Sequence, residues 1–308
     1  MVSARLPVFP WDTLADATAT ARAHPDGIVD LSVGTPVDPV APVIQEALTA
    51  AAAAPGYPAT AGTAALRASA VAALRRRHGI AGVPEQAVLP VIGTKELIAW
   101  LPTLLGLGPD DLVVVPELAY PTYEVGARLA GAGVVPADSV TQLGPQAPAV
   151  VYLNSPSNPT GKVLGVEHLR KVVEWARDRG TVVVSDECYL GLGWEEQPIS
   201  VLHPEVCDGD HTGLMAVHSL SKSSSLAGYR AGFVVGDPVL VAELLAVRKH
   251  AGMMVPTPVQ AAMVAALDDD EHQHQQRECY AERRAVLLAA FVFVGVTIIG
   301  FARHGTHF

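Results

Sequence analysis

The sequence predicts an α/β protein with a mostly parallel sheet that is covered by helices on both faces. Five short valine-rich runs are each typical of a fully buried strand; they are Leu112–Glu117, Ala149–Asn154, Thr181–Glu187, Leu214–Ser219 and Gly232–Gly236. Between two of these runs, residues 165–180 place apolar side chains at helical spacing and end on Gly180, which indicates a crossover helix. Buried strands joined by such helices indicate a sheet between two helical layers.

The composition narrows the class of protein. The chain has 308 residues, of which 50% are hydrophobic, so it can bury a large core in one or two domains. Its formal charge is −10 and its densest basic run is only Arg75–His78, so we expect no nucleic-acid partner. The three cysteines form no CxxC pair and the N-terminus resembles no export signal, which together indicate the cytoplasm.

Two segments near the C-terminus could suggest a membrane span and a metal site, and a simpler explanation is favoured for each. The uncharged run Val286–Phe301 is shorter than the about 20 residues that a membrane span needs, so a buried strand pair or a displaced core segment is favoured and no membrane partner is expected. His272 and His274 are two residues apart, which places them on different sides of a helix. No metal site is therefore predicted there.

Two charged residues at strand ends suggest chemistry. Lys222 follows the strand that ends at Ser219, and a desolvated lysine at such a position can form a Schiff base with a carbonyl compound. Asp186 ends another strand, where a buried carboxylate needs a partner such as a protonated pyridine nitrogen. A surface lysine in a serine-rich turn and a helix-capping aspartate are the alternatives.

Further polar residues follow the same strands. Tyr189 could hydrogen-bond a ring hydroxyl, and "NSPSNPTG" is a turn that could place Asn158 at the same ring oxygen. In "VIGTKELIAWL" a strand, a glycine and a helix follow one another, so the backbone N–H groups of Thr94 and Lys95 would face an anion. Ser219 and Arg230 would complete a phosphate site, although capping or surface roles explain each of these residues singly.

Taken in order, "SPSNPTG", "SDECY" and "SLSK" followed by an arginine eight residues later resemble the motifs of the class I/II aminotransferases of fold type I, which use pyridoxal 5′-phosphate. The resemblance implies a seven-stranded type of sheet and a covalent bond between Lys222 and the cofactor. It places Asp186 on the pyridine nitrogen, Asn158 and Tyr189 on the ring oxygen, and four residues at the phosphate: Thr94, Lys95, Ser219 and Arg230.

The same resemblance implies three further site residues. Tyr120 in "ELAYPTYEVGA" matches the aromatic residue that stacks on the cofactor ring, and Gly34 in "LSVGTPVD" matches the glycine beside the substrate. Tyr57 in "GYPATAG" matches the tyrosine that reaches the phosphate site of a neighbouring subunit, which implies a homodimer. Lys222 would then transfer the proton between the substrate α-carbon and the cofactor.

Longer stretches narrow the resemblance. "DGIVDLSVGTPVDPV", "LPVIGTKELIAWLPTLLGL" and "HSLSKSSSLAGYRAGFVVGD" look like the actinobacterial succinyldiaminopimelate transaminases of lysine biosynthesis. These enzymes move an amino group between glutamate and N-succinyl-2-amino-6-oxopimelate. Another aminotransferase or lyase of this fold, and a cofactor-binding remnant without turnover, are the alternatives, whereas no GxGxxG motif supports a nicotinamide-binding protein.

The C-terminal sequence departs from this family. The stretch "FVFVGVTIIGFARHGTHF" lacks the expected arginine for the substrate α-carboxylate, and Arg303 is a poor substitute, so a truncated or frameshifted small domain and impaired substrate binding are expected. The expected organisation is an N-terminal arm with part of the small domain, a large cofactor-binding domain, a helical link and an atypical tail, at residues 1–33, 34–250, 251–290 and 291–308.

Overall fold

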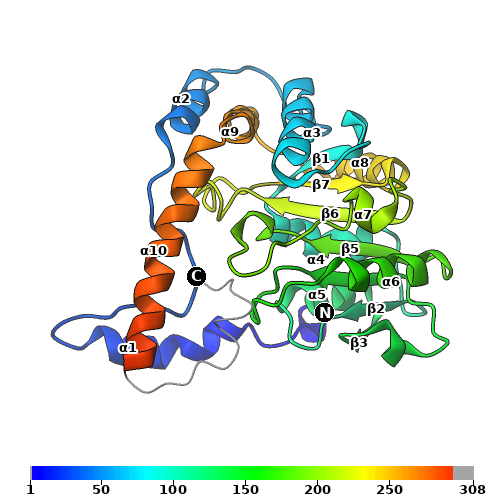
Figure 1. The fold of residues 1–308 in the computed structure, drawn as a ribbon, viewed down its shortest axis with the longest axis horizontal. Helices are drawn as coiled ribbons and strands as arrows, with labels where there is room; N and C mark the ends of the chain where they lie inside the picture. Colours follow the sequence, from blue (N-terminus) through cyan, green and yellow to red (C-terminus); the bar gives the residue numbers. More distant parts are fainter. Residues whose placement is uncertain (1, 294–308) are drawn as a thin grey trace.

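The computed structural model describes residues 2–293 and has a seven-stranded sheet at its centre (Figure 1). The strands lie in the order β1-β7-β6-β5-β4-β2-β3. Their bounds are β1 (Val88–Ile92), β2 (Leu112–Val115), β3 (Gly133–Pro136), β4 (Val150–Asn154), β5 (Val182–Asp186), β6 (Leu214–Ser219) and β7 (Ala231–Gly236). The predicted α/β class and the mostly parallel sheet are confirmed, and all five predicted strands are present.

Only β7 runs against its neighbours. The pairs β2–β3, β2–β4, β4–β5 and β5–β6 are parallel, whereas β7 is antiparallel to both β6 and β1. The first residue of β7 therefore lies at the sheet edge where β1, β4, β5 and β6 end. Consecutive pairings along this edge join Asn154 to Asp186, Ser219 to Gly232 and Ile92 to Ala231.

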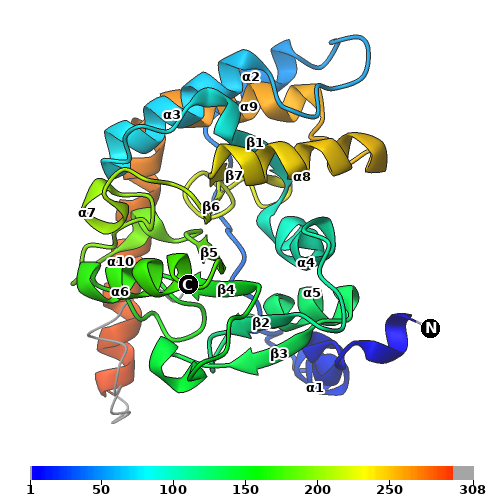
Figure 2. The same ribbon diagram turned by 90° about the vertical axis from the view of Figure 1, so that its right-hand side faces the viewer.

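Helices cover both faces of the sheet. Their bounds are α1 (Ala15–Arg22), α2 (Pro42–Ala50), α3 (Ala64–His78), α4 (Thr94–Leu104), α5 (Thr122–Ala130), α6 (Val166–Arg177), α7 (Pro204–Cys207), α8 (Pro238–Ala251), α9 (Thr257–Asp268) and α10 (Glu271–Phe293). Helices α4, α5 and α8 cover one face, and α3, α6 and α9 pack on the other, as Figure 2 shows. Side chains alternate between the two cores, so Val183 joins one and Val184 the other.

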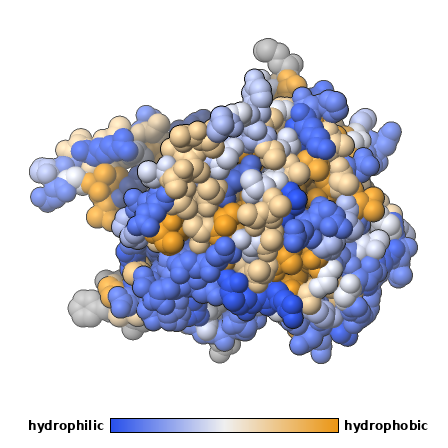
Figure 3. Space-filling view, turned by 90° about the horizontal axis from the view of Figure 1, so that it is seen from above, coloured by the Kyte–Doolittle hydropathy of each residue, from blue (hydrophilic) through white to orange (hydrophobic). Residues whose placement is uncertain are grey.

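Two segments far apart in the sequence lie side by side. The extended chain before α2 runs along α10 (Figure 1), and Asp38 accepts two hydrogen bonds from the guanidinium of Arg283 and one from Gln276. The segment after α1, which projects farthest to the left in Figure 1, carries exposed Val29 and Leu31, and Figure 3 shows apolar side chains on the projection at that side.

The apolar run at 286–301 is only partly described. Residues 286–293 continue α10, so the expected buried strand pair is wrong for this part, because the helical hydrogen bonding of α10 extends through it and Val286 is 72% exposed. The rest of the run, Arg303 and most of the predicted tail lie outside the described residues. Within residues 2–293, no helix is both long and apolar enough to cross a membrane.

A buried ion pair fixes α4 against α8, and its removal tests the packing. The guanidinium of Arg248, 0% exposed, donates to both carboxylate oxygens of Glu96 at 2.9 and 3.3 Å. Because breaking a buried pair leaves an uncompensated charge, we expect Arg248→Ala to lower the free energy of unfolding by about 3 kcal/mol. Urea unfolding measures this. The exposed neighbour Lys249→Ala is the control, and equal unfolding midpoints for both variants would contradict the expectation.

Candidate active site

The polar residues singled out from the sequence gather at one edge of the sheet. Asn154, Asp186 and Ser219 are the last residues of β4, β5 and β6. Gly93 follows β1, and Arg230 precedes the antiparallel β7, so both reach the same edge. The predicted location of the site at the carboxyl ends of the strands matches this arrangement.

Lys222 lies in the turn between β6 and β7 and is half-buried. Its ammonium group donates a hydrogen bond to the backbone oxygen of Gly34, so the two residues that the sequence singled out separately are in contact. Burial lowers the pKa of Lys222. Among the ion pairs of the described residues, none joins a carboxylate to Lys222.

Asp186 is a buried carboxylate without a cation. It is 7% exposed and accepts hydrogen bonds from the Tyr123 hydroxyl at 2.8 Å and from the Cys188 backbone N–H at 3.2 Å. Burial raises the pKa of Asp186, and hydrogen bonds from the Cys188 thiol, the Tyr123 hydroxyl and the Cys188 backbone N–H partly oppose that shift. Among residues 2–293 it has no ion-pair partner, so a cationic group of a ligand would stabilise its charged form.

Tyr123 is a site residue that sequence reasoning missed. It lies in the first turn of α5, is 1% exposed and packs its ring 5.0 Å from that of Tyr152. Burial and the adjacent charge of Asp186 raise the pKa of Tyr123, so the hydroxyl remains a donor to the carboxylate. The only signal in the sequence is a second tyrosine three residues after Tyr120, and nothing local connects it with Asp186.

Asn154 organises the turn that carries Asn158. The side-chain oxygen of Asn154 accepts the Asn158 backbone N–H at 2.7 Å, and its amide donates to the Asp186 backbone oxygen at 3.0 Å. The Asn158 side chain in turn hydrogen-bonds Tyr189. Burial is the main cause of a raised pKa at the Tyr189 phenol. Asn158 and Tyr189 are thus adjacent, as expected of two groups that share one ligand oxygen.

The start of α4 has the geometry of the predicted anion site. Helix α4 begins at Thr94, directly after Gly93, so the backbone N–H groups of its first turn have no partner within the helix. Thr94 Oγ1 accepts a hydrogen bond from the Cys188 thiol at 3.3 Å. Ser219, whose side chain also hydrogen-bonds Cys188, accepts the Ser221 N–H with its Oγ at 3.1 Å.

Arg230 approaches this helix start very closely. Its guanidinium donates to the Ala227 backbone oxygen at 2.8 Å and, within the described part of the chain, pairs with no carboxylate. A Cβ atom at position 93 would lie only 2.2 Å from Arg230 Nη2, and Gly93 has φ +76. A glycine is therefore required both for the backbone conformation and for the space that the guanidinium fills.

Lys95 and Tyr120 lie near aromatic rings of the N-terminal arm, whereas Tyr57 is exposed. The Lys95 ammonium group lies 5.7 Å from the centroid of the Tyr120 ring and 5.3 Å from that of Phe9, so its side chain contacts the N-terminal arm, and only its backbone N–H belongs to the helix start. The Tyr120 ring also lies 6.4 Å from that of Trp11. Tyr57 is 97% exposed before α3, so its position in a second subunit stays a prediction.

Together these groups form a continuous site around Cys188. Its backbone N–H binds Asp186, its thiol donates to Thr94, and it interacts electrostatically with Lys222. Next to Thr94, Gly93 contacts Arg230. These groups fit the three ends of pyridoxal phosphate. The carboxylate suits its cationic ring nitrogen, the amine suits its aldehyde, and the helix start with the guanidinium suits its phosphate.

Comparisons with known sequences agree with this geometry. The chain matches the family Aminotransferase class I and II over residues 26–302. The probable aminotransferase Rv1178 of Mycobacterium tuberculosis is 80% identical over 297 residues, which cover 96% of this chain and 71% of that protein. The 4-dedimethylamino-4-oxo-anhydrotetracycline transaminase OxyQ of Streptomyces rimosus is 58% identical, with 95% and 81% covered.

A more distant relative and a solved structure extend the comparison. The LL-diaminopimelate aminotransferase of Aquifex aeolicus is 31% identical over 88% of this chain and 73% of its own length. The crystal structure of an aminotransferase from Neisseria meningitidis matches with a TM-score of 0.81 at 30% identity, covering 92% of this chain and 76% of that one. Fold, site and sequence agree, and the chain belongs to the class I and II aminotransferases, enzymes that depend on pyridoxal phosphate.

Proposed function

We propose that this aminotransferase moves an amino group between glutamate and N-succinyl-2-amino-6-oxopimelate, in the cytoplasmic synthesis of lysine and diaminopimelate. The long stretches around Gly34, Thr94 and Lys222 that resemble succinyldiaminopimelate transaminases support this substrate. The similarity to an LL-diaminopimelate aminotransferase supports a diaminopimelate skeleton. The convergence of Lys222, Asp186 and Arg230 around Cys188 is the observation that carries the proposed chemistry.

Each group of the site receives a role in this proposal. Pyridoxal phosphate supplies an aldehyde and an electron-withdrawing ring when it is bound. Lys222 would hold the cofactor at its aldehyde carbon and, once released, would move the proton at the substrate α-carbon. A lowered pKa favours both tasks because more of the amine is unprotonated near neutral pH. Asp186 pairs with the ring nitrogen, and Tyr123 orients Asp186.

The remaining residues position the ligand. Asn158 and Tyr189 hold the ring hydroxyl, and Tyr120 stacks on the ring. The helix start at Thr94 and Lys95, with Ser219 and Arg230, holds the phosphate. Gly34 lies beside the substrate because it contacts Lys222 directly. Tyr57 would complete the phosphate site of a second copy of the chain in a homodimer.

OxyQ supports a second candidate substrate. At 58% identity over 95% of this chain it is more similar than the diaminopimelate enzyme, and by its name it aminates the ketone of an anhydrotetracycline. A cyclic ketone of this kind is therefore the specific competitor to the open-chain oxopimelate. Both would use the same amine, carboxylate and phosphate site and would differ only in how the rest of the substrate is bound.

The first prediction concerns the covalent role of Lys222. Addition of pyridoxal phosphate should give the visible absorbance of the lysine-bound cofactor, and glutamate should bleach it. In Lys222→Ala the absorbance should be lost and the rate with glutamate should fall by at least ~10²-fold, since both the covalent link and the proton transfer are removed. The exposed Lys171→Ala is the control. Wild-type protein that stays colourless would refute the assignment.

The second prediction concerns the substrate. With glutamate as donor, turnover should be faster with N-succinyl-2-amino-6-oxopimelate than with the acceptor that lacks the succinyl group or with the 4-oxo-anhydrotetracycline. Steady-state kcat/KM values for the three acceptors decide between them. A higher value for either competitor would reassign the substrate, whereas cofactor absorbance without any turnover would identify a cofactor-binding remnant.

The third prediction concerns Tyr123. Tyr123→Phe removes the hydroxyl that donates to Asp186, a hydrogen bond to a charged group worth about 1.5 kcal/mol, so the affinity for pyridoxal phosphate should fall about tenfold. Fluorescence titration of apoprotein measures it. Tyr152→Phe is a matched control, because that hydroxyl donates to the Ile98 backbone oxygen instead. Equal affinities of the two variants would show that Tyr123 does not support Asp186.

The fourth prediction concerns Tyr57. Lys222→Ala and Tyr57→Phe chains, each less active alone, should regain activity when refolded together, because a mixed dimer has one site with both native residues. The regained fraction should depend on the mixing ratio, with a maximum near equal amounts. Mixtures no more active than the average of the two variants, or a monomer by light scattering, would contradict a shared site.

A further inference from the structure

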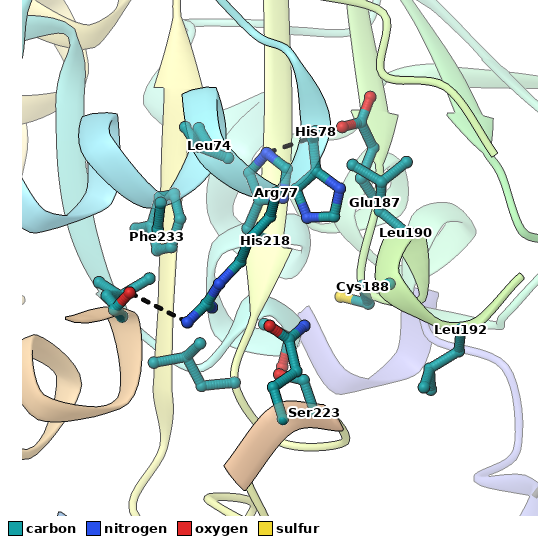
Figure 4. Close-up of a pocket in the computed structure, with 16 residues that line it drawn as sticks. Leu74, Arg77, His78, Glu187, Cys188, Leu190, Leu192, His218, Ser223 and Phe233 are labelled. Carbon is teal, nitrogen blue, oxygen red and sulfur yellow. Dashed lines mark hydrogen bonds and ion pairs between the residues drawn. The ribbon is translucent and has the colours of Figure 1, made fainter. Parts of the chain in front are cut away.

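A second polar cluster lies on the far side of Asp186 from Tyr123. Glu187, the residue after β5, lines a cavity of ≈ 40 Å³ between the strand ends and the end of α3. Figure 4 shows the Glu187 carboxylate and the His218 ring pointing toward one another there, with His78 and Arg77 beside them. The cavity has room for one water molecule. The proposed cofactor chemistry uses none of these side chains.

Two buried atoms in this cluster lack partners. Glu187 Oε1 accepts the Val201 N–H at 2.8 Å, but Glu187 Oε2 and His218 Nε2 make no hydrogen bond with any described group. The two atoms are 3.6 Å apart, and the side chains are 1% and 8% exposed. Buried polar atoms are rarely left unpaired, so a proton between these two is the simplest way to satisfy both. A small rotation or one bridging water closes the remaining gap.

The surroundings disfavour a charge on His218. Its ring stacks 5.1 Å from Phe233 and 6.5 Å from His78. Burial, with a contribution from His78, lowers the pKa of His218 to about 3, and burial with the charge of Arg77 lowers that of His78 to about 4. The Arg77 guanidinium also lines the cavity and is bonded to Asp270 and to backbone oxygens. These surroundings favour a neutral His218 ring, in which one nitrogen can accept a hydrogen bond.

The surroundings also disfavour a charge on Glu187. The titratable groups that face it are Asp186 and Cys188 beside it in the chain, His218 from β6, and His78 and Arg77 from α3. Burial, with a smaller contribution from the charge of Asp186, raises the pKa of Glu187 to about 7, although hydrogen bonds from Val201, Ser200 and Ser185 oppose the shift.

We propose that Glu187 is a positioning residue that keeps its carboxyl proton and donates it toward Nε2 of His218, so that Asp186 ionises first and alone at the end of β5. A second negative charge on the next residue would oppose ionisation of Asp186. Holding Glu187 neutral therefore leaves Asp186 ready for a cationic ligand. The importance of this for catalysis rests on the proposed function, but the proton itself is a property of the apoprotein.

Infrared spectroscopy of the apoprotein tests the proton directly. At pH 6 we expect the C=O band of a protonated carboxyl in wild type. The band should be lost in Glu187→Gln and retained in Asp186→Asn, the matched control in which the adjacent carboxyl is replaced by an amide. The band should titrate with a midpoint near 7. In Asp186→Asn the midpoint should move to lower pH because the neighbouring charge is gone. A band absent from wild type at pH 6, or unchanged in Glu187→Gln, overturns the proposal.

Stability gives a second readout on the same variants. A carboxyl whose pKa rises from 4.5 in the unfolded chain to about 7 in the folded protein binds more protons when folded, so wild type should lose stability as the pH rises from 4.5 to 7. Glu187→Gln cannot ionise and should lose less. The melting temperature of Glu187→Gln minus that of wild type should therefore rise across this window and stay constant above it; a difference that stays constant throughout overturns the proposal.

Nitrogen NMR of His218 completes the test if the glutamine variant does not fold. In wild-type apoprotein, the His218 ring should be neutral with an unprotonated, hydrogen-bonded Nε2 from pH 5 to pH 6.5; its signal is assigned by its loss in His218→Gln. A doubly protonated ring in this range would mean that the proton belongs to the histidine. Because no cofactor or substrate is present, failure here leaves the aminotransferase assignment intact.

Discussion

Asp186 lies 7% exposed at the end of β5 and, within residues 2–293, is hydrogen-bonded by Tyr123 and Cys188 but has no cation beside it. A buried carboxylate of this kind is costly by itself, because its hydration is lost and only part of that loss is returned by hydrogen bonds. A cationic ring nitrogen would compensate for it. The hydroxyl of Tyr123 on one side and the neutral Glu187 proposed on the other both leave the charge of Asp186 available for that contact.

The direction of β7 brings Arg230 to the same end of the sheet as Lys222. Because β7 runs antiparallel to β6 and β1, the chain that leaves β6 with Lys222 returns to the same sheet edge at Arg230. There the guanidinium occupies the space that a side chain at position 93 would need. One reversal of strand direction therefore brings the Lys222 amine and the proposed anion-binding group Arg230, eight residues apart, to the same end of the sheet.

Local sequence was sufficient for residues whose position follows from the strand they end. Asp186, Ser219 and Lys222 were predicted in this way, whereas β3 was missed because Gly133–Pro136 is a partly exposed edge strand without a continuous buried run. Tyr123 and the Glu187–His218 pair depend on contacts between elements that no spacing reveals. The contact of the Lys95 side chain with rings of the N-terminal arm likewise joins distant elements, so the sequence did not reveal it.

The N-terminal segment is tied to the site through charges rather than through a hydrophobic core. Val29 and Leu31 are exposed, whereas Gly34 contacts Lys222. Four residues later, Asp38 accepts hydrogen bonds from Arg283 and Gln276 of α10. A bidentate arginine–carboxylate pair constrains both distance and orientation. The position of Gly34 beside Lys222 therefore depends on α10, so a displacement of that helix would alter the surroundings of the amine that we propose to be reactive.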